Sequence, residues 1–213
     1  MEPTLIETAE PTLTRYDVPG APRALALVLH GGKDRSHAEV TGRSASWRRA
    51  TALAHALRGP LHDDGVGIWV LRYRTVGWNR DGADKIADAR WALGRARSDL
   101  GELPVALVGH SMGGRTACHV ADDDLVRGVV ALAPWLPPSE RVEALAGRAL
   151  HAAHGSRDHI TRPRDTRAYV ERARSVAAEA TYTDVEGAGH YMLRRVPAWN
   201  AFTLEHVRRV LDR

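Results

Sequence analysis

The stretch Val105-Ala-Leu-Val-Gly-His-Ser-Met-Gly-Gly114 decides how this chain folds. Its first residues predict a short apolar strand, and a helix is predicted to begin directly after it, near Met112. Such an abrupt turn from strand to helix places Ser111 in a strained backbone conformation and lifts its hydroxyl above the surface. Gly109 and Gly113 leave the space that the turn needs. The free N–H groups at the helix start could hold an anion beside the serine.

A serine hydroxyl at neutral pH needs a base, and the base needs a carboxylate to orient it. Two later apolar segments end in suitable residues, the first in a loop with Asp158 and the second in glycines followed by His190. Asp184 and Glu186 lie nearer to His190 in the sequence and are alternatives to Asp158. Asp184 is expected to point along a strand, however, and Glu186 lies where that strand ends.

Upstream, the predicted strand at residues 24–29 breaks into the turn His30-Gly-Gly32. With this turn and with serine, acid and histidine in that order, the chain resembles the α/β-hydrolase family, as a small esterase-like member without a cap. The resemblance extends from about residue 13 to the C-terminus. It implies an α/β fold, with a doubly wound and mostly parallel sheet of about seven strands in a three-layer αβα arrangement.

The resemblance also implies a role for each site residue. Ser111 is the expected nucleophile, His190 the base, and Asp158 the acid that orients the base. The backbone N–H groups of Met112 and Gly32 are the expected oxyanion hole, and the N–H of Lys33 is the alternative to that of Gly32.

Apolar runs predict strands and amphipathic patterns predict helices, and the two alternate along the chain. The predicted strands are residues 13–18, 24–29, 66–73, 105–109, 126–133, 149–154 and 180–185. The predicted helices are residues 46–57, 81–100, 164–177 and 197–212, with a short one from about Ser139. Residues 1–11 are interpreted as a lead-in and residues 12–213 as a single domain. Residues 134–148 are too few for a large cap, because a parallel crossover alone needs a dozen or more.

The expected substrate pocket is formed by the loops at the same sheet edge. Its predicted residues are His30, Lys33, Trp78, His110, Trp135, Leu136, Tyr191 and Met192. Within this set, His30 is expected to support the oxyanion turn through a hydrogen bond. Arg74 and Arg80, near Trp78, could bind a substrate carboxylate or could simply be solvated.

The 213 residues are 44% hydrophobic and 26% charged, which is ordinary for a globular protein. The net charge is +4, but the sequence has no stripe of basic residues interleaved with aromatic ones. Nucleic acid is therefore not an expected partner. The single Cys118 excludes a disulfide within the chain. Without a signal-peptide pattern or an apolar run of membrane-spanning length, we expect a cytoplasmic monomer or homodimer without membrane contact. No cofactor and no metal are expected, because His151 and His154 would lie on opposite faces of a strand.

The leading hypothesis is therefore a serine hydrolase that cleaves a small carboxylic ester through an acyl-enzyme on Ser111. The same three side chains would also suit a thioesterase, a lactonase or an amidase. A ligand-binding protein without catalysis on the same fold is the alternative from another class.

Overall fold

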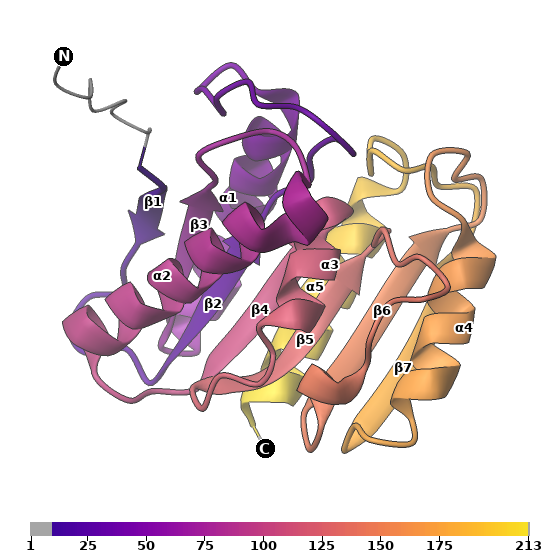
Figure 1. The fold of residues 1–213 in the computed structure, drawn as a ribbon. Helices are drawn as coiled ribbons and strands as arrows, with labels where there is room; N and C mark the ends of the chain where they lie inside the picture. Colours follow the sequence, from indigo (N-terminus) through magenta and orange to yellow (C-terminus); the bar gives the residue numbers. More distant parts are fainter. Residues whose placement is uncertain (1–9, 213) are drawn as a thin grey trace, which may run out of the picture.

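One sheet of seven strands organises residues 10–212, the part of the chain that the computed structural model describes (Figure 1). The strand order is β1-β3-β2-β4-β5-β6-β7, and every neighbouring pair is parallel except β1 with β3. The strands are β1 (Thr12–Tyr16), β2 (Ala24–Leu29), β3 (Val66–Arg72), β4 (Val105–His110), β5 (Val126–Leu132), β6 (Ala149–Gly155) and β7 (Glu179–Val185). Residues 1–9 of the predicted lead-in lie outside the described residues.

Helices cover both faces of the sheet and give the predicted αβα layers (Figure 1). One face packs against α1 (Ala45–Asp63) and α5 (Val196–Leu211). The other face packs against α2 (Ala83–Leu100), α3 (Met112–His119) and α4 (Pro163–Ala173). Side chains alternate between the faces along a strand, so β2 contributes its leucines to one core and Ala24, Ala26 and Val28 to the other. A strand buried on both sides must be apolar throughout, which explains its sequence.

The sequence predictions for the strands are confirmed to within one or two residues at each end. Three helical predictions are wrong in detail. The helix predicted over residues 164–177 ends at Ala173, because the N–H groups of Ser175 and Val176 bond only three residues back and form turns. The helix predicted to end at residue 57 continues to Asp63, through Pro60, because Leu61 is buried in the core. The helix predicted from about Ser139 is replaced by a single 3-10 turn, η2 (Glu143–Leu145), the only helical piece in the described segment between β5 and β6. A second 3-10 turn, η1 (Arg80–Gly82), precedes α2.

The parallel strands all end at one edge of the sheet, at the top of Figure 1. The loops that follow β2, β4, β6 and β7 therefore meet there, which is where open α/β sheets bind ligands. None of the helices within residues 10–212 combines the length and the apolar character that crossing a membrane requires.

Candidate active site

Ser111 occupies a sharp turn between β4 and α3. Its backbone angles are φ 54° and ψ −118°, a conformation that non-glycine residues rarely adopt. The turn is held by hydrogen bonds from the Ser111 N–H to the Leu132 carbonyl, at 3.0 Å, and from the Trp135 N–H to the Ser111 carbonyl, at 3.1 Å. A Cβ on Gly113 would lie 2.1 Å from the Leu29 carbonyl oxygen, so only glycine fits there. The predicted strand-turn-helix is thus present, with the serine at its apex.

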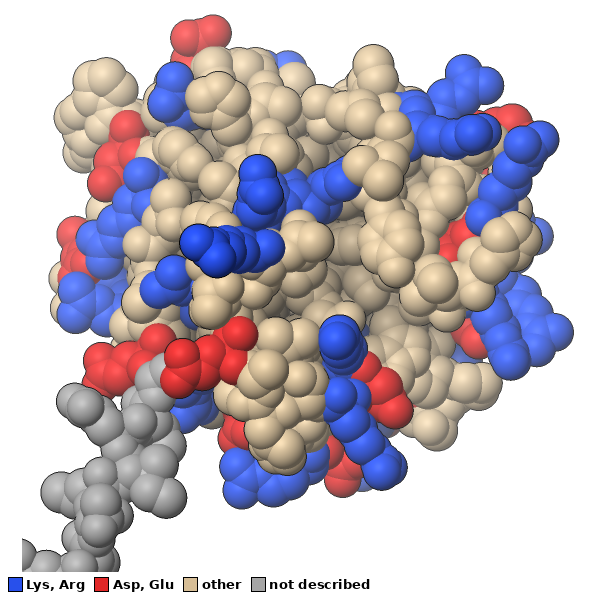
Figure 2. All heavy atoms as spheres, turned by 90° about the horizontal axis from the view of Figure 1, so that it is seen from above, with Lys and Arg blue, Asp and Glu red and all other residues tan. Residues whose placement is uncertain are grey.

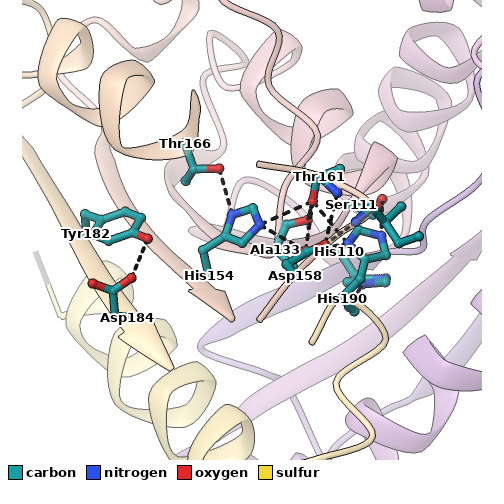
Figure 3. Close-up of polar contacts among 11 residues, drawn as sticks. His110, Ser111, Ala133, His154, Asp158, Thr161, Thr166, Tyr182, Asp184 and His190 are labelled. Carbon is teal, nitrogen blue, oxygen red and sulfur yellow. Dashed lines mark hydrogen bonds and ion pairs between the residues drawn. The ribbon is translucent and has the colours of Figure 1, made fainter. Parts of the chain in front are cut away.

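His190 and Asp158 lie beside Ser111 in one line of hydrogen bonds (Figure 3). The His190 Nε2 atom is 3.0 Å from the Ser111 Oγ atom, and the His190 Nδ1 atom is 2.8 Å from the Asp158 Oδ2 atom. All three side chains are at least nine-tenths buried. The structure thus brings together three residues that are 79 and 32 positions apart in the chain.

The alternative acids lie elsewhere. Asp184 is exposed, accepts a hydrogen bond from the Tyr182 hydroxyl at 2.7 Å and pairs with Arg167 at 2.8 Å. Figure 3 shows the Tyr182–Asp184 pair apart from the group around Ser111. Glu186 is exposed at the turn that follows β7. Asp158 is therefore the carboxylate that contacts His190.

Asp158 is held by a dense set of donors. Its Oδ1 atom accepts the backbone N–H groups of Ile160, at 2.8 Å, and Thr161, at 3.0 Å. Its Oδ2 atom accepts the Thr161 hydroxyl at 3.0 Å and lies 3.0 Å from the Nε2 atom of a second histidine, His154. The Nδ1 atom of His154 is in turn 2.9 Å from the Thr166 hydroxyl (Figure 3). Both histidine rings thus converge on one carboxylate oxygen.

Electrostatics at the site follow from this packing. Burial alone would raise the pKa of Asp158, but the hydrogen bonds from His154 and His190 outweigh burial, so this pKa lies well below its usual value. Burial, with the nearby His190 as a second cause, lowers the pKa of His110 to about 3. The Nε2–H of neutral His110 can then donate to the His190 carbonyl, 2.9 Å away. Asp158 is therefore charged and His110 neutral near pH 7.

The turn after β2 lies against Ser111, as the sequence predicts. A Cβ on Gly31 would be 3.2 Å from the Ser111 Cβ atom, and one on Gly32 would be 2.6 Å from the Met112 Sδ atom. The Lys33 N–H donates to the Val76 carbonyl at 3.0 Å, so it is engaged. Within residues 10–212, the N–H groups of Met112 and Gly32 donate to no protein acceptor. Of the two alternatives for the second oxyanion donor, Gly32 is thus the one with a free N–H.

A cavity of about 230 Å³ opens at Ser111. Its walls include three of the predicted pocket or oxyanion residues, Gly32, His110 and Tyr191, together with Arg49 and Leu193. The complete lining is Gly31, Gly32, Ala45, Ser46, Arg49, His110, Ser111, His190, Tyr191 and Leu193. The predicted Met192 lies in the wall of an adjoining cavity between α1 and α5.

Besides Met192, five predicted pocket residues do not line the cavity at Ser111. His30 is fully buried behind the turn, where its Nδ1 atom is 2.6 Å from the Gly31 carbonyl oxygen and its Nε2 atom accepts the Tyr73 N–H at 3.3 Å. The backbone of Lys33 is bound to Val76, and its side chain is exposed.

The other three are Trp78, Trp135 and Leu136. Trp78 and Trp135 pack edge to face, with ring centroids 6.2 Å apart, and the Arg115 guanidinium lies over both rings. Trp135 and Leu136 line a separate cavity near Ile160. Aromatic side chains of two loops therefore pack on each other here instead of forming walls around Ser111.

The predicted carboxylate-binding arginines are also engaged. Arg74 pairs with the buried Asp88 at 2.6 Å, and Arg80 pairs with Asp84 at 2.9 Å. Neither arginine lines the cavity at Ser111.

The sequence reasoning missed His154, Thr161 and Arg49. His154 precedes Asp158 by four residues at the end of β6, and this spacing could have placed its ring beside the carboxylate. Thr161 follows in the same loop. In the sequence, Arg49 comes directly before Ala50, a buried residue of α1. It lines the cavity only because the turn after β2 passes beside this part of the helix. Within residues 10–212, no group of three or more His, Cys, Asp or Glu side chains is placed to hold a metal ion.

Comparison with known proteins gives the family context. A family model described as alpha/beta hydrolase fold matches residues 27–152, more than half of the chain. No curated protein matches the sequence. Among solved structures, an alpha-beta serine hydrolase homologue from Coxiella burnetii is 16% identical, with a TM-score of 0.72 over 92% of this chain and 91% of that one.

Two further solved structures are similar in fold. A serine hydrolase without a lid from Xanthomonas campestris is 19% identical, with a TM-score of 0.68 over 93% of this chain and 88% of its own. A thermophilic esterase from Thermogutta terrifontis, with butyrate bound, is 18% identical, with a TM-score of 0.70 over 97% and 90%.

Proposed function

The chain belongs to the alpha/beta hydrolase fold family, and from this premise we propose that it is a serine hydrolase that cleaves small carboxylic esters. The observation that carries the proposal is the line of hydrogen bonds from Ser111 through His190 to Asp158, at 3.0 and 2.8 Å. These lengths are within the range expected of a nucleophile, its base and the group that orients the base.

The proposed reaction proceeds through an acyl-enzyme. The Ser111 Oγ atom attacks the ester carbonyl carbon while the His190 Nε2 atom takes the hydroxyl proton. His190 then gives this proton to the departing alkoxide, so the ester C–O bond breaks and the acyl group stays on Ser111. In the second half, His190 takes a proton from water, and the water oxygen attacks the acyl carbon. The bond from this carbon to the Ser111 Oγ atom then breaks, the acid leaves, and His190 returns the proton to the serine. Asp158 accepts the Nδ1–H of His190 throughout and stabilises the ring while it is positively charged.

The N–H groups of Met112 and Gly32 are the proposed donors to the oxyanion. Both are free of other acceptors within the described residues, and Met112 is the first residue of α3, so the positive end of the helix dipole adds to its effect. Removing one such donor typically costs about a hundred- to a thousandfold in kcat.

Small esters are the proposed substrates because the cavity at Ser111 is only about 230 Å³ and no helical cap formed by residues 10–212 covers it. Two of the similar structures support this choice, one described as lacking a lid and one as an esterase with butyrate bound. Thioesters, lactones and activated amides react through the same steps and are alternative substrates.

The decisive experiment combines turnover with covalent labelling. We expect the protein to hydrolyse p-nitrophenyl butyrate and to react with a fluorophosphonate probe at Ser111. We expect Ser111→Ala to abolish labelling and to lower kcat by about a thousandfold or more, with an unchanged circular dichroism spectrum. A folded protein that neither reacts with the probe nor turns over any ester would instead favour a ligand-binding protein without catalysis.

A further inference from the structure

Two cavities meet at Arg49. The cavity at Ser111 and a larger one of about 450 Å³, between α1 and α5, share Ala45 and Arg49 in their linings. The remaining lining of the larger cavity is Arg48, Ala52, Leu53, Ala56, Met192, Val196, Trp199 and Asn200. An elongated molecule with its reacting carbonyl at Ser111 could therefore continue past Arg49 into this second space.

The walls of both cavities are apolar, and their charged groups are all positive. The lining of neither cavity includes an Asp or a Glu, whereas Arg49 borders both and Arg48 the larger. Figure 2, which looks onto this edge of the sheet, shows basic side chains next to the hollow near the middle of the face. Such walls suit an apolar molecule that carries acceptor oxygens and a negative charge.

Arg49 is available for such a charge. Its side chain is only partly exposed, and within residues 10–212 it forms neither an ion pair nor a hydrogen bond. Partial burial lowers the pKa of Arg49, which reflects the cost of withdrawing a guanidinium from water without a partner. By contrast, Arg74 and Arg80, for which the sequence left carboxylate binding or solvation open, pair with Asp88 and Asp84.

Exposed apolar side chains surround the same opening. Tyr191 is 59% exposed, Leu193 68% and Val196 44%, and each lines one of the two cavities. Large apolar side chains are costly to leave in water, so their concentration at a cavity mouth indicates a site that apolar groups cover.

We propose that Arg49 is an anion-binding subsite, and that the preferred substrates are esters with a carboxylate on an apolar chain. This inference rests on the proposed hydrolysis at Ser111 and specifies its substrate class. The planar guanidinium matches a carboxylate through paired N–H donors. One guanidinium at the junction balances a single negative charge, which favours a carboxylate over a phosphate monoester, whose charge is closer to −2.

The carboxylate could belong to the acyl or to the alcohol part of the ester, and two substrate pairs distinguish these cases. For the acyl part the pair is monoethyl adipate and its neutral carboxamide analogue, ethyl adipamate. For the alcohol part it is the O-acetyl ester of ω-hydroxycaproate and the corresponding amide. We expect kcat/KM to be about tenfold or more higher for the anionic member of at least one pair.

Arg49→Gln is expected to reduce this anionic-to-neutral ratio by about ten- to a hundredfold, mainly through KM. Arg58→Gln is the matched control, because Arg58 is an exposed arginine of the same helix that lines neither cavity. We expect this control to keep the wild-type ratio. Equal ratios in wild type and Arg49→Gln, or no preference for the anion in either pair, would overturn the subsite.

A binding measurement separates failure of the subsite from failure of the proposed reaction. In the Ser111→Ala protein, calorimetry should detect monoethyl adipate or O-acetyl ω-hydroxycaproate binding more tightly than the matching amide, and Arg49→Gln should remove the difference. Such binding without any turnover by the wild type would refute the hydrolase and keep the subsite. Turnover of the neutral esters without preferential binding of the anions would refute the subsite and keep the hydrolase.

Discussion

Asp158 accepts more hydrogen bonds than the orientation of one histidine requires. Its Oδ1 atom is fixed by two backbone N–H groups, and its Oδ2 atom is shared by His190, His154 and the Thr161 hydroxyl. Because each donor stabilises the ionised carboxylate, Asp158 remains charged while it faces a buried ring. The proton of His190 is thereby held on Nδ1, which leaves Nε2 free to accept the serine proton.

The exchange Asp158→Asn tests this assignment. The amide oxygen can still accept the N–H groups of Ile160 and Thr161, so the NH2 group must face His190 and His154. His190 would then accept at Nδ1 and carry its proton on Nε2, where it can no longer take the proton of Ser111. We expect kcat to fall by about 10⁴-fold, as measured with p-nitrophenyl butyrate, with the fold intact.

The matched control is Asp184→Asn, the same chemical change at one of the two carboxylates that lie nearer to His190 in the sequence. Asp184 is exposed and pairs with Tyr182 and Arg167. We expect its kcat to stay within about twofold of wild type, because no contact links it to His190. If the two variants lost activity equally, Asp158 would have no special role.

The sequence predicted which three side chains meet beside Ser111 more completely than it predicted their surroundings. Ser111, Asp158 and His190 each follow an apolar strand, and the carboxyl ends of parallel strands must meet at one edge. The four-residue spacing of His154 from Asp158 is a weaker signal, and the contact of Thr161 with Asp158 depends on a side-chain direction that no local pattern encodes. For the same reason, the sequence does not distinguish Arg49, which lines the cavity, from the many solvated arginines.

At the level of elements, the turn between β4 and α3 has no room for an added side chain at its glycines. A Cβ on Gly109 would lie 2.4 Å from the Gly113 carbonyl oxygen and 2.5 Å from the Gly114 nitrogen. These neighbours are backbone atoms, and they cannot move without moving Ser111. Gly94, in the middle of α2, is exposed, and a Cβ there would meet nothing within 4 Å.

Opposite results are therefore expected for the same substitution at these two glycines. Gly109→Ala should lower the free energy of unfolding by about 1–3 kcal/mol or more, because the turn is overpacked. Gly94→Ala should raise it by about 0.5–1 kcal/mol, because alanine loses less backbone entropy in a helix. Urea unfolding curves measure both changes. A neutral Gly109→Ala variant would mean that the turn is looser than its backbone contacts indicate.

Strands were easier to predict than helix ends and loops. A strand buried on both faces is marked by a continuous apolar run, and β2 was predicted at the bounds it has. Helix α1 continues past its predicted end at residue 57, because the burial of Leu61 outweighs the local stop signals Gly59 and Pro60. Trp78 and Trp135 were expected around the substrate, but a loop's path depends on the whole molecule, and their rings pack on each other.

At the scale of the whole molecule, two buried histidines couple folding to pH. Burial lowers the pKa of His30 to about 4, and burial with the nearby His190 lowers that of His110 to about 3. In the unfolded chain both return to about 6.5. Between about pH 6.5 and 4 the unfolded chain therefore binds more protons than the folded one, and the free energy of unfolding must fall as the pH falls.

We expect these two histidines together to cost about 4 kcal/mol of stability between pH 7 and pH 5, measured by urea unfolding at both values. Asp158 does not contribute in this window. Its pKa is lowered in the fold, so its stabilisation is present above the unfolded value near 4 and is lost only at more acidic pH.

The variant His110→Gln tests whether this histidine causes the slope of the unfolding free energy against pH. Glutamine keeps a donor for the His190 carbonyl, which His110 contacts at 2.9 Å, but it cannot take up a proton near pH 6. The pH dependence of the unfolding free energy should therefore shrink by about half, even if the variant is less stable at pH 7. His37→Gln is the control, because it makes the same exchange at an exposed histidine instead of a buried one. A wild-type slope in His110→Gln would show that protonation of this ring does not oppose folding.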